Sequence, residues 1–399
     1  MIDNTALAHP SQAPAEVTVD ALAAHGPAEQ AHLAGHKSSL VVPATVAFIL
    51  IAITGLLIAA FLVVSLGTGA VAIAGFMALV PLAVVLLGIR WIDRWEPEPR
   101  GLLIFAFLWG AVTSVFVALA ASLVVELAQQ NLGVGDAERE LLGGVVQAPV
   151  VEEFAKGLGI LLIFLVARKY FDGPVDGVVY AATIAAGFAF TENILYFGTE
   201  IVQGGTVQGA VGIFIVRGVM SPFAHVMFTI CTGVAVGLAS RRTGALGGLI
   251  AFAIGLVPAM LLHALWNGAS YVVGESFLIY YVLVQMPLFI GAIVLVVLLR
   301  RAETRTTRAR LAEYAEAGWY NPDEIVALAT PAGRRQAMAW ARSLGLGMVM
   351  KGYIVDSTKL AFIRQRLVSG RATRGAQVEE AAMLAAIVAR RAALTIPRV

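Results

Sequence analysis

Long apolar runs recur through most of this chain and restrict what it can fold into. A helix needs about 20 apolar residues to cross a bilayer, and about eight runs between Val41 and Leu299 reach that length. Composition agrees, because 59% of the 399 residues are hydrophobic and 14% are charged, whereas soluble domains are nearer half apolar and a quarter charged. We therefore predict an all-α polytopic membrane protein, a bundle of about eight transmembrane helices. The approximate spans are 41–66, 70–89, 102–129, 144–167, 175–199, 212–239, 244–271 and 277–299.

The loops between these runs alternate in charge, which predicts the orientation of the chain. Basic residues follow the second, fourth and sixth runs, whereas the loops after the odd-numbered runs carry only Arg139. Because basic loops stay in the cytoplasm, both termini are expected there, which agrees with an even number of spans. The residues that carry this bias are Arg90, Arg94, Arg100, Arg168, Lys169, Arg241 and Arg242.

Two flanking regions differ from the apolar middle of the chain, residues 41–300. Residues 1–40 are rich in Ala, Pro, Glu, Gln and His without a period, which is typical of a disordered tail, here cytoplasmic. In residues 301–399 bases outnumber acids, and helix-start signals occur at Asn321 and Thr330. We predict a small basic helical cytoplasmic appendage there. It either faces the anionic inner leaflet of the lipid bilayer or is solvated without a partner, and no motif indicates nucleic-acid binding.

Ionisable residues inside the apolar runs are the second informative feature. Each costs about 2.5–3.5 kcal/mol at the centre of a bilayer, so such residues indicate a functional site. Counting about 1.5 Å of rise per residue from the helix ends, several of them fall in one slab in the outer half of the bilayer. They are Glu152, Glu153 and Lys156 of the fourth run, Glu192 of the fifth, His225 of the sixth, and His263 with Asn267 of the seventh.

Spacing predicts which of these side chains share a helix face. Glu152 lies one turn before Lys156, and His263 lies one turn before Asn267. Glu153 points about 100° away from Glu152, so one glutamate can face a cavity while the other braces a neighbouring helix. Small residues at the same spacing let helices approach closely, so the polar faces are expected to be packed. These small residues are Ala185, Ala189, Gly233, Gly255 and Ala259.

These residue types permit two hydrolytic schemes. Two histidines and one carboxylate make a three-ligand zinc site with an open position for water. A further glutamate can take the proton from that water, whose pKa zinc lowers to about 7. Without a metal, Glu152 deprotonates water directly while a histidine and Asn267 hold the oxyanion. Both schemes hydrolyse an acyl bond, and the residues leave both open.

Interpretations without hydrolysis also remain open. The Glu152–Lys156 segment can form a structural ion-pair cluster, and His263 with Asn267 a polar lock between helices, as in a non-catalytic membrane scaffold. A transporter or proton relay is a third class, although no clear inverted repeat of the kind transporters show is present. Arg217 and Arg139 are interpreted as interface anchors. The shared depth of the ionisable residues favours a hydrolase over these alternatives.

Four separated motifs resemble those of the PrsW family of intramembrane proteases. They are "EEFAK" from Glu152, "DGVVYAATIAAGFAFTEN" from Asp176, "SPFAH" from Ser221 and "HALWN" from His263, with "DRWEPEP" upstream. The resemblance covers about residues 80–270. The chain departs from the related CAAX prenyl endopeptidases and bacteriocin-processing proteins. Their Phe-x-x-x-His motif is not matched, because Phe223 lies two positions before His225, and a glutamate, Glu192, ends "FAFTE" where a histidine is expected.

The resemblance implies a multi-pass endopeptidase in the plasma membrane of a bacterium. Family members act in regulated proteolysis, so the implied partner is a membrane-protein substrate, for example an anti-sigma factor cut on its extracytoplasmic side. The family has been described as metalloproteases, whereas relatives are argued to be metal-free glutamic proteases. For a zinc-dependent enzyme we assign Glu192, His225 and His263 as the metal ligands. The catalytic positions carried over by motif are Glu152, Glu153, Glu192, His225 and His263, with Asn267 beside them.

Overall fold

The computed structural model describes most of the chain outside its first forty residues. Among the described residues the regular structure is entirely helical, which confirms the predicted all-α class. The predicted tail, residues 1–40, lies outside the described residues. The chain divides into two units, one containing Pro43–Arg94 and Glu98–Val297, the other containing Trp95–Pro97 and the described residues from Leu298 onward. The described ranges are 41–204, 207–241, 244–272, 274–370 and 375–395.

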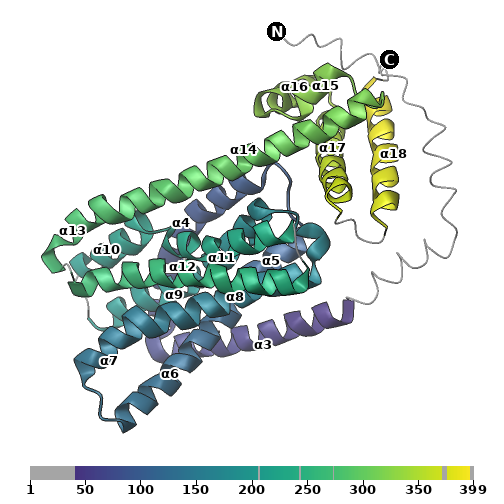
Figure 1. Cartoon of the computed structure of the whole chain (residues 1–399). Coiled ribbons are helices and arrows are strands. Elements are labelled where there is room, and N and C mark those ends of the chain that lie inside the picture. Colours follow the sequence, from purple (N-terminus) through teal and green to yellow (C-terminus); the bar gives the residue numbers. More distant parts are fainter. Residues whose placement is uncertain (1–40, 205–206, 242–243, 273, 371–374, 396–399) are drawn as a thin grey trace. The chain divides into compact units, whose positions relative to one another are not determined.

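The larger unit is a bundle of long apolar helices (Figure 1). In the described part of the chain, 7 helical stretches are long and apolar enough to cross a membrane. They correspond to seven of the predicted runs, although the last helix continues past 299 to Glu316. The seven stretches are formed by α3 (Val41–Leu66), α4 (Thr68–Asp93), α5 (Arg100–Leu108) with α6 (Val115–Asn131), α9 (Pro174–Val202), α10 (Val207–Phe214) with α11 (Ala224–Ser240), α12 (Ala245–Val272), and α13 (Phe277–Tyr280) with α14 (Met286–Glu316).

The remaining predicted run forms α8 (Ala148–Val166), which follows the short helix α7 (Asp136–Leu142). Its three charged residues, Glu152, Glu153 and Lys156, lie within five successive positions. All three point into the bundle, because Lys156 is 0% exposed, Glu153 1% and Glu152 9%. The outward face of α8 is apolar, as expected of a helix against lipid. Its exposed residues include Val150, Phe154, Leu162, Leu165 and Val166.

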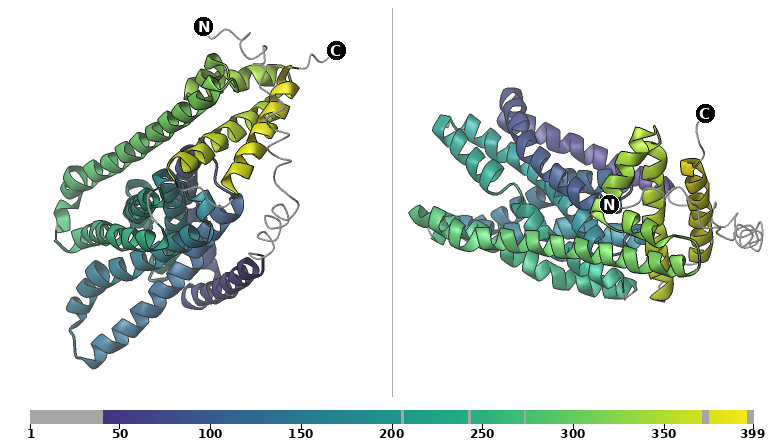
Figure 2. Two further views of the ribbon diagram at one scale, coloured as in Figure 1. Left: turned by 45° about the vertical axis from the view of Figure 1, so that its right-hand side comes forward. Right: turned by 90° about the horizontal axis from the view of Figure 1, so that it is seen from above.

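Helix α9 is the centre of the larger unit. Of the 18-residue apolar segment of α9 that could cross a membrane, 78% is buried, against 17% of the corresponding segment of α3. It packs against α4 and α11, and α11 packs against α12 (Figures 1 and 2). Gly177 of α9 and Gly233 of α11 face one another, and a Cβ on either would overlap the carbonyl oxygen of the other. A Cβ on Gly255 of α12 would lie 2.7 Å from the Cα of Thr232. The small residues therefore allow backbone-to-backbone contact, as predicted for Gly233 and Gly255.

In the described residues of the smaller unit, four helices follow α14. Both predicted helix starts are present: the Asn321 N–H donates to Glu324 Oε2 (2.8 Å), and the Gly333 N–H donates to Thr330 Oγ1 (2.9 Å). Figure 1 shows the last two helices side by side. The unit also buries Trp95, whose ring lies 3.3 Å from the Arg334 guanidinium. The four helices are α15 (Pro322–Leu328), α16 (Pro331–Ser343), α17 (Gly347–Val368) and α18 (Ala376–Thr395).

Candidate active site

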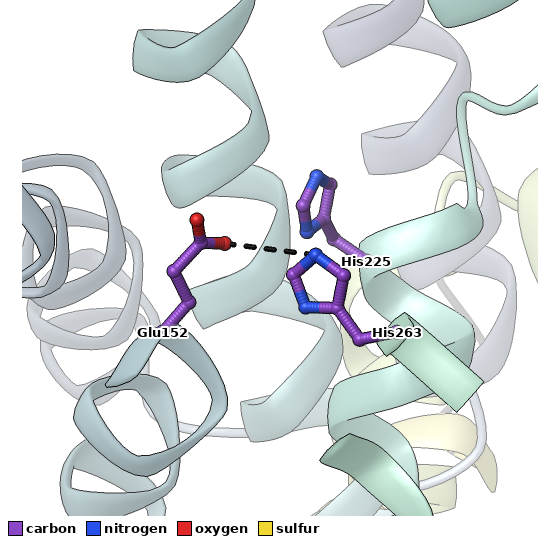
Figure 3. A group of neighbouring side chains, drawn as sticks. All are labelled: Glu152, His225 and His263. Carbon is purple, nitrogen blue, oxygen red and sulfur yellow. Dashed lines mark ion pairs between the residues drawn. The ribbon is translucent and has the colours of Figure 1, made fainter. Parts of the chain in front are cut away.

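Four helices of the larger unit direct polar side chains toward one point. Glu152, Glu153 and Lys156 come from α8, Glu192 from α9, His225 from α11 and His263 from α12. Figure 3 shows the side chains of Glu152, His225 and His263 converging from three of these helices. The structure thus brings the predicted residues together, whereas their roles in catalysis stay a prediction.

Glu153 is the most fully bonded residue of this group. Its Oε1 atom lies 2.6 Å from Lys156 Nζ and 3.0 Å from His263 Nδ1, and its Oε2 atom accepts a hydrogen bond from Thr229 Oγ1 (2.8 Å). Both carboxylate oxygens are therefore occupied by groups from three helices. Hydrogen bonds to charged groups are among the stronger ones in proteins, so Glu153 braces the site.

Glu152, the preceding residue, is bonded differently. Its Oε2 atom lies 3.8 Å from His263 Nε2 and 3.6 Å from Lys156 Nζ, both too long for a direct hydrogen bond. Among the described residues this buried oxygen has no hydrogen-bond partner. Leaving a buried acceptor unsatisfied costs about 1–3 kcal/mol, so an atom in this position indicates a site for a ligand or a water molecule. The two adjacent glutamates therefore differ as the spacing predicted: Glu153 braces neighbouring helices, and Glu152 lines a cavity.

His225 is held by a second carboxylate. Its Nε2 atom lies 2.8 Å from Glu192 Oε2, and its Nδ1 atom lies 3.2 Å from Lys156 Nζ. Arg217 pairs with the same Glu192 oxygen, and its Nε donates to Asn193 Oδ1 (2.8 Å). The sequence analysis interpreted Arg217 as an interface anchor. The structure corrects this, because its guanidinium reaches into the site and fixes Glu192.

The predicted metal ligands, Glu192, His225 and His263, stay a prediction. A second group that could hold an ion is Glu152, His225 and His263, with one donor atom of each within 4.8 Å of the others. Glu192 pairs with Arg217. This ion pair holds the Glu192 carboxylate against Nε2 of His225.

One carboxylate and two imidazoles are a donor set that suits catalytic zinc. In addition, each imidazole has its other nitrogen against a carboxylate, Glu153 or Glu192. That arrangement orients metal-bound histidines in known zinc sites. The unpartnered oxygen of Glu152 completes a set that fits the ion. Lys156 Nζ lies 3.6 Å from Glu152 Oε2 and 3.2 Å from His225 Nδ1, so its ammonium supplies positive charge beside these two donors.

Asn267 takes a more peripheral position. Its Nδ2 atom donates to the Gly144 carbonyl (2.9 Å), in the π-helical turn Gly143–Gln147 before α8. This contact ties the end of α12 to the start of the helix that carries the glutamates. The predicted role of Asn267 at the oxyanion stays a prediction.

Two side chains that contact the site residues were not predicted from the sequence. Thr229 donates to Glu153, and the Phe228 ring stacks on His263 with centroids 4.8 Å apart. Both residues lie three or four positions after His225, on the same face of α11. Helical spacing from His225 was the signal that could have found them.

A cavity of about 390 Å³ opens beside Glu152 and Glu192. Its size is within the range of ligand pockets in proteins. The walls come from α6, α8, α9 and α10. The lining residues are Val115, Ala118, Leu119, Ser122, Glu152, Phe188, Glu192, Leu195, Tyr196, Thr199, Glu200 and Ile213.

Fold and site together define an integral membrane protein with a buried centre of glutamates and histidines. Residues 98–292 match the model of the PrsW family intramembrane metalloproteases. The predicted resemblance to the PrsW family is confirmed over these residues.

Curated relatives agree with this assignment. Protease PrsW of Clostridioides difficile (strain 630) is 36% identical over 157 residues, which are 39% of this chain and 62% of that protein. Protease PrsW of Geobacillus kaustophilus (strain HTA426) is 31% identical over 141 residues, which are 35% of this chain and 55% of that protein. The chain thus spans less than two thirds of the length of these relatives. No solved structure matches the chain.

Proposed function

We propose that this chain is an intramembrane endopeptidase that hydrolyses a peptide bond of a membrane-protein substrate. One observation carries the proposal: the buried Oε2 atom of Glu152 has no hydrogen-bond partner among the described residues, and Glu152 lines the cavity. A carboxylate in this position can take a proton from an attacking water. Relatives that carry the name Protease PrsW support this class of reaction.

The spacing of Glu152 and His263 suits a water molecule between them. Polar atoms more than about 3.5 Å apart are commonly bridged by water, and Glu152 Oε2 and His263 Nε2 are 3.8 Å apart. Glu153 accepts the Nδ1 proton of His263, so a neutral imidazole presents Nε2 as an acceptor toward this position. Glu152 removes the proton of the water as the water attacks the carbonyl carbon of the substrate, and the same carboxyl group can return the proton to the leaving amine.

The other polar residues hold this arrangement in place. Glu153 orients His263, and Glu192 with Arg217 orients His225. The Lys156 ammonium balances the buried carboxylates. A zinc ion held by Glu152, His225 and His263 would supply Lewis acidity and lower the pKa of a water at the site. The donor set and the carboxylates behind both imidazoles fit the ion, and Glu152 would then be a ligand instead of the base.

We further propose the setting of the reaction. The basic loops place both termini in the cytoplasm of a bacterium, with the site in the outer half of the plasma membrane. A membrane-spanning anti-sigma factor cut on its extracytoplasmic side is the substrate that suits this depth. Alkaline phosphatase and green fluorescent protein fused to the C-terminus test the orientation. Fluorescence without phosphatase activity is expected, and active phosphatase contradicts it.

The proposed activity is tested by comparing cells that express the wild type with cells that express Glu152→Gln. New protein N-termini in the membrane fraction are labelled and identified in both strains. We expect a set of cuts that the variant lowers by about 100-fold or more, the range for loss of a general base. Glu126→Gln is the matched control, because Glu126 is an exposed carboxylate of α6 outside the cavity. Cuts that persist in a folded Glu152→Gln protein overturn the proposal.

A further inference from the structure

The cavity beside Glu152 is elongated along α9. Five of its lining residues, Phe188, Glu192, Tyr196, Thr199 and Glu200, recur at helical spacing on one face of this helix. The 12 residue steps from Phe188 to Glu200 correspond to about 18 Å at 1.5 Å per residue. On α6 the residues opposite also recur every three or four positions, from Val115 to Ser122. We call this channel between the two helices the α6–α9 groove.

The proposed hydrolysis favours an extended chain over a helix in the groove. A peptide bond must leave its helix before water can reach its carbonyl carbon, because neighbouring turns surround it. An extended chain advances about 3.3 Å per residue, so about five residues cover the length of the groove.

The lining of the groove suits such an unwound segment. Its walls are largely apolar, with Val115, Leu119 and Leu195 among them, and hydroxyl groups are contributed by Ser122 and Thr199. Unpaired backbone N–H and C=O groups are costly within a membrane. Hydroxyl groups on an apolar wall can donate to or accept from that backbone while the substrate side chains stay in apolar surroundings.

The far end of the groove carries a carboxylate that is not neutralised. Glu192 is paired with Arg217 and His225, whereas Glu200 has no hydrogen bond or ion pair with any described residue. Glu200 is partly exposed. It lies eight residues beyond Glu192, or about 12 Å along the helix axis. That distance equals about four residues of extended chain.

We propose that the α6–α9 groove binds an extended segment of the substrate and that Glu200 selects a Lys or Arg about four residues from the scissile bond. This inference rests on the proposed peptidase activity, since Glu152 marks the position of the scissile bond. Both carboxylates line the groove: the buried Oε2 atom of Glu152 has no hydrogen-bond partner among the described residues, and Glu200 has no partner among them either. Glu200 is a specificity residue and takes no part in the chemical step.

The test compares cleavage-site sequences in cells that express the full-length wild type, Glu200→Gln or Glu200→Lys. Cuts are first restricted to those that Glu152→Gln abolishes. Around these cuts the wild type is expected to show Lys or Arg at one fixed position about four residues away. Glu200→Lys is expected to replace that preference by Asp or Glu and to lower cutting at the wild-type sites by about fivefold, the upper end for a partly exposed ion pair. Glu138→Lys, which reverses an exposed carboxylate of α7, is the control and is expected to change nothing.

The outcomes separate this inference from the activity itself. Cuts that depend on Glu152 but show no basic preference, or a preference that Glu200→Lys leaves unchanged, overturn the inference and leave the peptidase proposal intact. The absence of any cuts that depend on Glu152 overturns the peptidase proposal. Where Glu200→Lys does not accumulate in the membrane, Glu200→Gln decides, because it is expected to lose the basic preference without gaining an acidic one.

Discussion

The Nδ1 atom of His263 lies 3.0 Å from Oε1 of Glu153, and this contact directs the other nitrogen of the ring toward Glu152. Two glutamates adjacent in sequence thus lie on the two sides of one imidazole. Glu153 is saturated by Lys156, His263 and Thr229, whereas the Oε2 atom of Glu152 is left without a hydrogen-bond partner among the described residues. This asymmetry leads to different expectations for the two residues.

Replacing either glutamate by glutamine is expected to change stability in opposite ways. Glu153→Gln leaves the buried Lys156 without its closest counter-charge, which costs about 3–5 kcal/mol. Glu152→Gln removes a buried charge that has no hydrogen bond to its Oε2, so the melting temperature is expected to stay unchanged or to rise. Thermal unfolding of both variants after treatment with a chelator measures the difference. Equal destabilisation by the two substitutions would contradict the assigned roles.

Arg217 is expected to be required for activity although it lies behind the reacting groups. Arg217→Gln frees Glu192, which then holds the His225 ring less firmly. We expect cleavage to fall by about tenfold or more, as for residues that orient a catalytic histidine. Arg217→Lys is expected to recover only part of this loss, because lysine lacks the planar fork of donors that reaches Glu192 and Asn193 together.

The same variants show whether Arg217 acts through Glu192. Glu192→Gln alone and the double variant Arg217→Gln/Glu192→Gln should be about as active as Arg217→Gln, because residues that act as a unit are not additive. Rates of appearance of one labelled product measure this relation. Independent, multiplying losses would show that Arg217 serves another purpose.

Metal content tests the zinc-dependent alternative and distinguishes its ligand set, Glu152, His225 and His263, from the one inferred from sequence. For a zinc-dependent enzyme we expect about one zinc per chain in purified wild type and none in His225→Ala/His263→Ala. Glu192→Gln should weaken binding by about 10- to 100-fold without abolishing it, as expected for a partner of a ligand. Elemental analysis after dialysis against graded chelator measures both. Zinc retained by the double histidine variant would exclude the proposed metal site.

The contact between α9 and α11 gives a test of the fold. In Gly233→Ala the new Cβ would overlap the Gly177 carbonyl oxygen, so the two helices must separate, at a cost of about 1–3 kcal/mol for overpacking. Gly212→Ala in α10 is the matched control, because no atom lies within 4 Å of its would-be Cβ. The control should be neutral or stabilising by up to about 1 kcal/mol through helix propensity. Thermal unfolding in the same detergent compares the two, and equal melting temperatures would contradict the close contact.

Much of the fold follows from local patterns in the sequence. Apolar runs of sufficient length predict the helices of the bundle, and the caps at Asn321 and Thr330 predict two helices of the smaller unit. The end of α14 at Glu316 was missed, because a helix that leaves an apolar environment continues without any change in backbone pattern. Helix α8 also follows from an apolar run, although it carries three charged residues.

The site was predicted less completely. Depth and spacing bring Glu152, Glu192, His225 and His263 to one place, but depth cannot tell which carboxylate is neutralised. The neutralised carboxylate is the one that pairs with Arg217, which is Glu192. The Arg217 side chain starts from the π-helical turn Ile215–Met220 and reaches Glu192 on another helix. A pairwise contact of this kind has no periodic signature, so the sequence could not show that Glu192 pairs with Arg217 while Glu152 groups with the two histidines.

Hydrolysis in ¹⁸O-labelled water tests the central claim most directly. Wild-type protein in lipid vesicles is given a substrate identified by N-terminal labelling, and the new C-terminal fragment is analysed by mass spectrometry. We predict one ¹⁸O atom in the new carboxyl group with the wild type and with Glu126→Gln, and no product with Glu152→Gln. Undiminished product from a folded Glu152→Gln protein would contradict the account.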